Sequence, residues 1–495
     1  MKLSNRYLIY TLLATVFLST GCKKLVDIDE PINTVTSVRI FASDAQADQT
    51  LAGMYSQMVG NDNTTTLIQG GATIYGGLAA DEFNVTNSVN YPEDYDVFRN
   101  NIMTKNSISE TVLWLPAYKV INTANAILDG EAASVSSNLT KGKRIEMKAS
   151  AKFIRAYCYF YLSNFFGEIP LVLTSDFTKN LRLKRVAQEE VYQQMITDLK
   201  EALALLSDPD AVALKAKSRV TKAAVQALLA RTYLYLKDWE NAEKYATEVI
   251  GSNAFQLETL AKTFDATSKE TIFQLYVNPG VVFGLGETIN LSPAAPLSLF
   301  PPADQAMFLD PDNYDGFAEV LQPRIGLNEG LVNAFEDGDK RKTTWVNYNG
   351  TPNVSPYFAK RFYFADKYPM SDTERTNYVL MRLAEVYLIR AEARAMQNKI
   401  SLVAGDLNLI RNRAGLGNTT ATNQTALLEA IAQERRTELF AEWGHRFFDL
   451  KRTGKALSVL ATIPEKQGVT ANRLLFPIPS KEILANSNLT QNPGY

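Results

Sequence analysis

Residues 221–250 read TKAAVQALLARTYLYLKDWENAEKYATEVI. Two runs of apolar residues with helical spacing lie on either side of a turn at Asp238 and Trp239. Their apolar positions are Leu229, Ala230 and Tyr233 before the turn and Ala242, Tyr245, Ala246 and Val249 after it. Small alanines let two helices approach, while tyrosine and leucine fill the groove between them. The stretch therefore predicts a pair of antiparallel helices.

This helix pair fits a tetratricopeptide unit, although Gln226 stands where that repeat usually has its first tryptophan and no proline closes it. One such pair cannot bury its own apolar face, so neighbouring helices are required. Further runs with helical spacing lie after a cap at Ser43 and Asp44, at 114–128, at 145–160, at 377–397, and from Leu407 to a terminating glycine at Gly415. The runs at 114–128 and 145–160 are expected to pack against each other.

The predicted fold is therefore dominated by α-helices. Tetratricopeptide-like helix pairs form a scaffold at about residues 37–60, 110–250 and 375–460, within a single domain of residues 37–495. Residues 60–107 are rich in Asn, Thr and Gly and are predicted to be loop, with flexible glycines at Gly70, Gly71, Gly76 and Gly77. Residues 251–370 hold 10 of the 19 prolines, a density that helices do not tolerate. Residues 251–374 are therefore predicted to be a loop-rich, aromatic-rich insertion with little regular structure.

The aromatic residues of these two segments have two possible roles. They can form a minor core against the scaffold, or they can form a platform for a sugar ring, whose C–H face packs on Trp or Tyr while its hydroxyls bind polar side chains. For the second role, the candidate ligand-binding residues are Tyr91, Tyr95, Tyr276, Tyr314, Trp345 and Tyr348, with Asp81 and Asn313 as polar partners.

The N-terminus carries the pattern of an export signal. Lys2 and Arg6 precede an apolar run that is too short to cross a bilayer and is followed by small residues. Residues 18–22 (LSTGC) resemble a bacterial lipobox, which predicts a signal peptide at 1–21, acylation of Cys22 and a tether at 22–36. The alternative is a plain signal peptide with an incidental cysteine. If Cys22 carries lipid, Cys158 has no partner in the chain and is expected to be an inert buried thiol.

Composition narrows the classes of function. The net charge of -2 offers no basic field for nucleic acid. The single histidine, His445, removes most histidine-based metal clusters and hydrolytic triads. No phosphate-binding loop, nucleophile elbow or paired-cysteine motif is present, so neither a cofactor nor a metal is expected.

Three glutamates in the C-terminal part could suggest catalysis. Glu434, Glu438 and Glu442 recur every four residues, so on a helix they would share one face and repel each other. A structural network in which Arg435, Arg446 or Arg452 neutralises them is the preferred interpretation.

Several motifs give the chain a family resemblance. The strongest covers Glu434, Arg435, Arg436, Glu438 and Leu439, followed by Glu442, Gly444, His445, Arg446, Phe447, Asp449, Leu450 and Arg452. It is preceded by Arg382 to Glu392 and by Arg411 to Leu416, and the chain ends with Gln491, Asn492, Pro493, Gly494 and Tyr495. With Asp81, Glu82 and Trp114 in the N-terminal half, this pattern resembles the SusD/RagB family of nutrient-binding outer-membrane lipoproteins.

The resemblance implies a non-catalytic, lipid-anchored protein on the outer face of the outer membrane. Its partner would be a SusC-like TonB-dependent transporter, over which it would act as a lid that binds an oligosaccharide and delivers it for uptake. Oligopeptide binding is the nearest alternative within the family. A surface glycan hydrolase and a pure protein-interaction scaffold are the alternatives from other classes.

Overall fold

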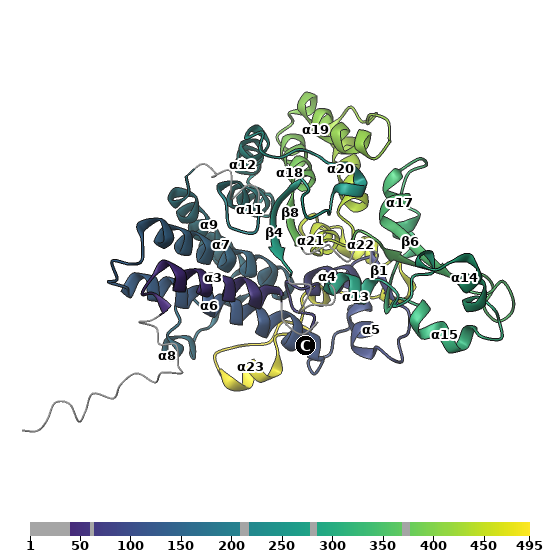
Figure 1. Ribbon diagram of the computed structural model, residues 1–495, viewed down its shortest axis with the longest axis horizontal. Helices are drawn as coiled ribbons and strands as arrows, with labels where there is room; N and C mark the ends of the chain where they lie inside the picture. The colour runs from purple at the N-terminus through teal and green to yellow at the C-terminus, as the bar shows by residue number, and fades with distance from the viewer. Residues whose placement is uncertain (1–39, 60–63, 208–216, 278–284, 369–376) are drawn as a thin grey trace, which may run out of the picture.

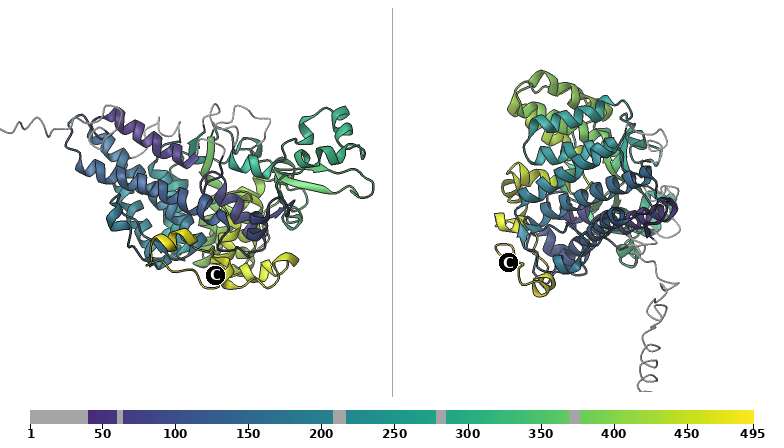
Figure 2. Two further views of the ribbon diagram at one scale, coloured as in Figure 1. Left: turned by 90° about the horizontal axis from the view of Figure 1, so that it is seen from below. Right: turned by 90° about the vertical axis from the view of Figure 1, so that its left-hand side faces the viewer.

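The computed structural model describes residues 40–59, 64–207, 217–277, 285–368 and 377–495. The predicted signal peptide, Cys22 and the tether lie outside these residues. Long helices form one side of the molecule and a smaller lobe projects at the other end (Figures 1 and 2). Among the described helices, none is long and apolar enough to cross a membrane.

The helical scaffold is one continuous array in which successive helices pack side by side (Figure 1). Its members are α3 (Asp44–Val59), α6 (Leu115–Ala133), α7 (Lys141–Phe166), α9 (Gln188–Leu205), α11 (Lys222–Tyr235), α12 (Trp239–Gly251), α18 (Leu383–Met396), α19 (Ile400–Arg413) and α20 (Gln424–Glu438). The pairs predicted from the sequence, α6 with α7 and α11 with α12, are both confirmed. Asp238 caps α12 by accepting the backbone N–H of Asn241 at 3.1 Å. The predicted helix-dominated class is therefore correct.

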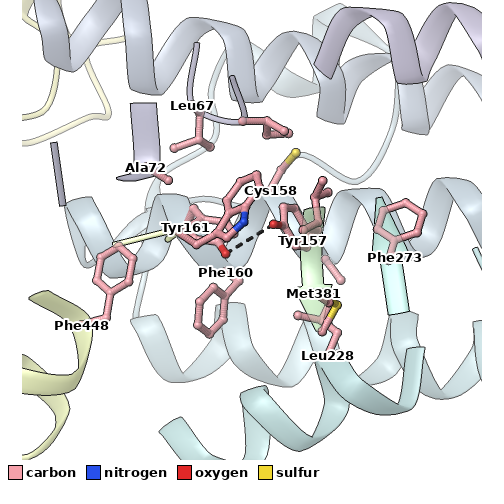
Figure 3. Packing of buried hydrophobic residues seen from close by; sticks show 14 of the residues in the cluster. Leu67, Ala72, Tyr157, Cys158, Phe160, Tyr161, Leu228, Phe273, Met381 and Phe448 are labelled. Carbon is pink, nitrogen blue, oxygen red and sulfur yellow. Dashed lines mark hydrogen bonds between the residues drawn. The ribbon is translucent and has the colours of Figure 1, made fainter. Parts of the chain in front are cut away.

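The core surrounds the second half of α7, where every residue from Phe153 to Phe166 is buried. Its tyrosines and phenylalanines meet side chains from distant elements, and Figure 3 shows Tyr157, Tyr161 and Phe448 in this cluster. The Tyr161 hydroxyl lies 3.4 Å from that of Tyr157. Cys158 is fully buried here, and burial raises the pKa of its thiol well above the usual value, as an inert thiol requires.

The run at 377–397 is only partly helical. Its first part is strand β8 (Asn377–Arg382), which pairs antiparallel with β4 (Thr271–Tyr276), and α18 begins at Leu383. The helix prediction was wrong over 377–382 because a short apolar run buried on both faces has no period that separates strand from helix.

The segment at 60–107 is not simply a loop. It contains α4 (Gly71–Ala79), β1 (Phe83–Val85) and α5 (Pro92–Phe98). The glycines predicted to be flexible are packing positions instead, since a Cβ on Gly76 would lie 2.6 Å from the Cα of Gly444. Glycine composition suggested a loop because it does not distinguish mobility from close backbone approach.

The predicted insertion holds short elements rather than irregular chain alone. Besides β4 and two 3-10 turns, these are α13 (Gly286–Leu291), α14 (Pro302–Phe308), α15 (Tyr314–Leu321), β5 (Ile325–Leu327), α16 (Glu329–Val332), α17 (Lys340–Trp345), β6 (Val346–Gly350) and β7 (Arg361–Ala365). Proline is compatible with α14 because Pro302 occupies its first turn. α14, α15 and the β6–β7 hairpin belong to the projecting lobe (Figure 1).

The remaining strands and helices are short. β1 pairs with β5, and β2 (Ile169–Pro170) pairs with β3 (Arg185–Val186), both antiparallel. A π-helical turn (Ile108–Trp114) precedes α6, and the other short helices are α8 (Phe177–Asn180), α21 (His445–Arg452), α22 (Ala456–Leu460) and α23 (Ser480–Ala485). The β1–β5 pair joins the early segment to the insertion.

Candidate functional site

Two of the aromatic candidates are core residues. Trp345 and Tyr314 are each 2% exposed. The indole N–H of Trp345 donates to the carbonyl of Leu260 at 3.0 Å, and Tyr314 packs edge-on against Tyr357 in a minor core of the lobe. Neither ring offers a free face for stacking, so the site described below does not include them.

Asp81 is also committed to the interior. It accepts from Arg446 at 2.7 Å and from Arg436 at 2.9 Å, which ties the end of α4 to α21 and α20. Burial acts to raise the pKa of Asp81, but the hydrogen bonds and charges of the two arginines hold it below the usual value. An ionised, doubly paired carboxylate here is a structural link.

Three further candidates lie at the surface on separate elements, and Tyr95 is partly buried against the core. Tyr276 at the end of β4 is 61% exposed and Tyr348 in β6 is 45% exposed. The guanidinium of Arg361 lies 4.6 Å from the Tyr348 ring centre. Asn313 is exposed before α15, and Tyr95 in α5 stacks on Phe98.

Tyr91 is the candidate that lines a substantial cavity. This cavity, of about 620 Å³, opens where α4, α5 and the start of β5 meet. Its lining is Thr64, Thr65, Tyr75, Asn90, Tyr91, Pro92, Glu93, Asp94, Ser107, Ile108, Thr111, Val112 and Arg324. We call it the Tyr91 cavity.

Arg324 organises this cavity. Its guanidinium lies 4.7 Å from the centre of the Tyr91 ring, and its Nε donates to Asp94 at 2.7 Å. A further N–H donates to the Asn290 side chain at 3.0 Å. Burial raises the pKa of Asp94 even with this arginine beside it. The bonds to Asp94 and Asn290 thus hold Arg324 against the Tyr91 ring.

Strand pairing brings Arg324 to Tyr91 from far along the chain. Arg324 lies directly before β5, and its backbone carbonyl accepts from the Thr86 hydroxyl at 3.1 Å beside the β1–β5 pair. Asp94 and Arg324 are 230 residues apart in sequence. The sequence analysis selected Tyr91 but missed Arg324, because no local pattern predicts a two-stranded pairing over that distance.

Close glycine packing builds the adjoining wall. Gly70 has a φ of +84°, and a Cβ on Gly286 would lie 2.3 Å from the carbonyl oxygen of Gln69. This approach seats α13 against the start of α4, and Asn290 of α13 donates to the Thr65 hydroxyl at 3.2 Å. Asn290 thus contacts two lining residues, Thr65 and Arg324, from outside the cavity.

The three glutamates form the expected structural network, with different partners. Glu434 and Glu438 accept from Arg341 of α17 at 2.6 and 3.1 Å, and Glu442 accepts from Arg382 at 2.7 Å. Glu438 also pairs with Arg413. The arginines suggested by the sequence bind elsewhere: Arg435 and Arg452 pair with Asp449, Arg452 also with Glu392, and Arg446 with Asp81. All three glutamates are buried, so the network joins elements of the scaffold and insertion.

His445 is a packed residue. It is 5% exposed, and burial lowers its pKa to about 4 against the attraction of Glu385. It is therefore neutral near pH 7.

A family model described as the SusD family matches residues 340–495, and one described as starch-binding associating with outer membrane matches residues 25–234. A SusD-like protein from Formosa agariphila is 29% identical, covering 78% of this chain and 80% of its own. The starch-binding protein SusD of Bacteroides thetaiotaomicron is 27% identical, covering 73% and 75%. The chain belongs to the SusD/RagB family.

Solved structures share the fold. A SusD superfamily protein from Parabacteroides distasonis has a TM-score of 0.73 at 24% identity, covering 93% of this chain and 100% of its own. A structure described as a laminarin binding SusD-like protein has a TM-score of 0.73 at 22% identity, covering 92% and 100%.

Proposed function

We propose that this chain is a non-catalytic outer-membrane lipoprotein that binds an oligosaccharide in the Tyr91 cavity and delivers it to a SusC-like TonB-dependent transporter. The observation that carries the proposal is the fixed stack of Arg324 on Tyr91 beside Asp94. A tyrosine supplies an apolar face for a sugar ring, and the carboxylate and amide groups around it supply acceptors and donors for hydroxyls.

The relatives support a glycan as the ligand. One is named as starch-binding and a structural neighbour as laminarin-binding, and the matched family is described as associating with the outer membrane. Capture next to a transporter is useful at modest affinity, because a ligand held against the pore has a high local concentration.

The ligand class is tested first by probing glycan and peptide arrays with the purified chain, followed by calorimetry and a search for cleaved product. We expect glycan binding without cleavage. Cleaved product would indicate a hydrolase, and binding only to peptides would support the oligopeptide alternative.

The position of the site is tested by three tyrosine variants. We expect Tyr91→Ala to weaken binding of the array hit by about 1–3 kcal/mol, the scale of a lost buried aromatic contact. Tyr276→Ala and Tyr348→Ala remove exposed rings on other elements and are expected to keep the wild-type affinity. If Tyr276→Ala or Tyr348→Ala weakens binding and Tyr91→Ala does not, the site lies at β4 or in the lobe.

A further inference from the structure

A second cavity lies in the helical scaffold, apart from the Tyr91 cavity. It has a volume of about 380 Å³ and lies where the α11–α12 turn, α18, α20 and α21 meet. Its apolar lining consists of Leu234, Trp239, Met396, Leu428, Ala432 and Leu450. We call it the scaffold cavity.

Positive charge surrounds this apolar lining. The cavity is lined by six cationic residues and three acidic ones: Lys237, Arg435, Arg436, Arg446, Arg452 and Lys455 against Glu392, Glu429 and Asp449. Asp81, which neutralises Arg436 and Arg446, lies behind the lining. The local charge is positive even when that carboxylate is included, although the whole chain has a net charge of -2.

Some of these cations have unused binding capacity. Arg435 is 4% exposed and binds Asp449 through Nε and Nη2, yet its Nη1 has no hydrogen-bond partner among the described residues. This Nη1 is closed off from solvent, so the cations that a ligand in the cavity can reach are the exposed lysines. Lys237 and Lys455 are exposed and form no ion pair within the part of the chain that the structure describes.

The lining favours a peptide over a sugar. A sugar needs hydroxyl partners along its length, whereas this cavity has an aliphatic floor, and its volume suits one or two side chains. A peptide with an apolar side chain and a neighbouring carboxylate would match both the apolar lining and the cationic residues around it. Grooves between stacked helix pairs commonly hold such extended segments.

We propose that the scaffold cavity is a docking site for an acidic peptide segment of a partner protein, which inserts one aliphatic or aromatic side chain and places a carboxylate near Lys237 and Lys455. This site is independent of the glycan proposal, because no residue lines both cavities.

The test is to pan a random dodecapeptide display library on the full chain and to measure the selected peptides by fluorescence anisotropy. We expect enrichment of Asp or Glu next to Leu, Ile or Phe, and affinity that falls as salt rises. A selection without acidic residues would overturn the proposal.

Charge-reversal variants then locate the binding. Lys237→Glu with Lys455→Glu is expected to weaken the selected peptide by about tenfold or more. The matched control, Lys105→Glu with Lys184→Glu, makes the same change of net charge on exposed lysines elsewhere and should leave the affinity unchanged. An equal loss in both pairs would show nonspecific attraction and overturn the site. Displacement of the peptide by decanoate at similar concentration would instead assign the cavity to a free amphiphile.

Discussion

At the scale of single residues, the carboxyl of Glu82 has a different environment from that of its neighbour Asp81, which is paired with two arginines. Glu82 is 1% exposed, and its Oε1 has no hydrogen-bond partner among the described residues. Burial, reinforced by the charge of Asp81, raises the pKa of Glu82 to about 8 against the attraction of nearby cations. The folded chain therefore retains a proton that the unfolded chain loses near pH 4.5.

This difference predicts the pH dependence of a variant. Because the folded-state pKa is raised, the stabilising contribution of the protonated carboxyl is fully present below about pH 4.5 and is lost as the pH rises toward 8. Glu82→Gln keeps the neutral form at every pH, so its free energy of unfolding should increasingly exceed that of the wild type from pH 5 to pH 8. Urea unfolding measures this, with the exposed Glu240→Gln as control. A variant that tracks the wild-type pH profile would contradict a buried, protonated Glu82.

At the scale of elements, helix α4 depends on glycine for its contact with α21. A Cβ on Gly76 would lie 2.6 Å from the Cα of Gly444, so the backbones must separate. We expect Gly76→Ala to lower the free energy of unfolding by about 1–3 kcal/mol. A Cβ added to Gly405, in the middle of α19, would meet no atom within 4 Å, and Gly405→Ala should stabilise by about 0.5–1 kcal/mol. Denaturant unfolding of both variants tests whether backbone contact, rather than helix propensity, determines the change in the free energy of unfolding at Gly76. If both substitutions stabilise the protein, close packing at Gly76 is refuted.

The same elements show what the sequence can and cannot predict. The helices α6, α7, α11 and α12 follow from the sequence, because apolar residues recur in each with helical spacing and this signal is local. The strand β8 and the cavity residue Arg324 depend on pairing with β4 and β1, which are distant in sequence, so their signal is not local. The burial of Trp345 and Tyr314 could likewise not be predicted, because the local sequence of an aromatic residue beside asparagine is the same in a minor core and at a sugar-binding surface.

At the scale of the whole molecule, the chain enters the fold far from the projecting lobe. The carbonyls of Phe41 and Ala42 accept from the hydroxyls of Ser134 and Ser136, directly after α6, at 2.7 and 2.6 Å. This point is at the scaffold end of the molecule, and α14 and α15 are at the opposite end (Figure 1). Neither Phe41 nor Ala42 lines the Tyr91 cavity.

This separation predicts that anchoring and binding are independent properties. If Cys22 is acylated, Cys22→Ala removes the lipid that holds the chain at the membrane, while the Tyr91 cavity stays intact. We expect the variant to keep the wild-type affinity for glycan by calorimetry, to lose labelling with radioactive palmitate and to leave the membrane fraction. If the chain delivers its ligand to a transporter as proposed, uptake in cells should fall even though binding persists, because such delivery depends on local concentration. The matched variant Cys158→Ala removes the buried thiol and should retain both lipid and membrane attachment. Undiminished labelling of Cys22→Ala would show that the lipid is elsewhere, and undiminished uptake would show that delivery does not need the anchor.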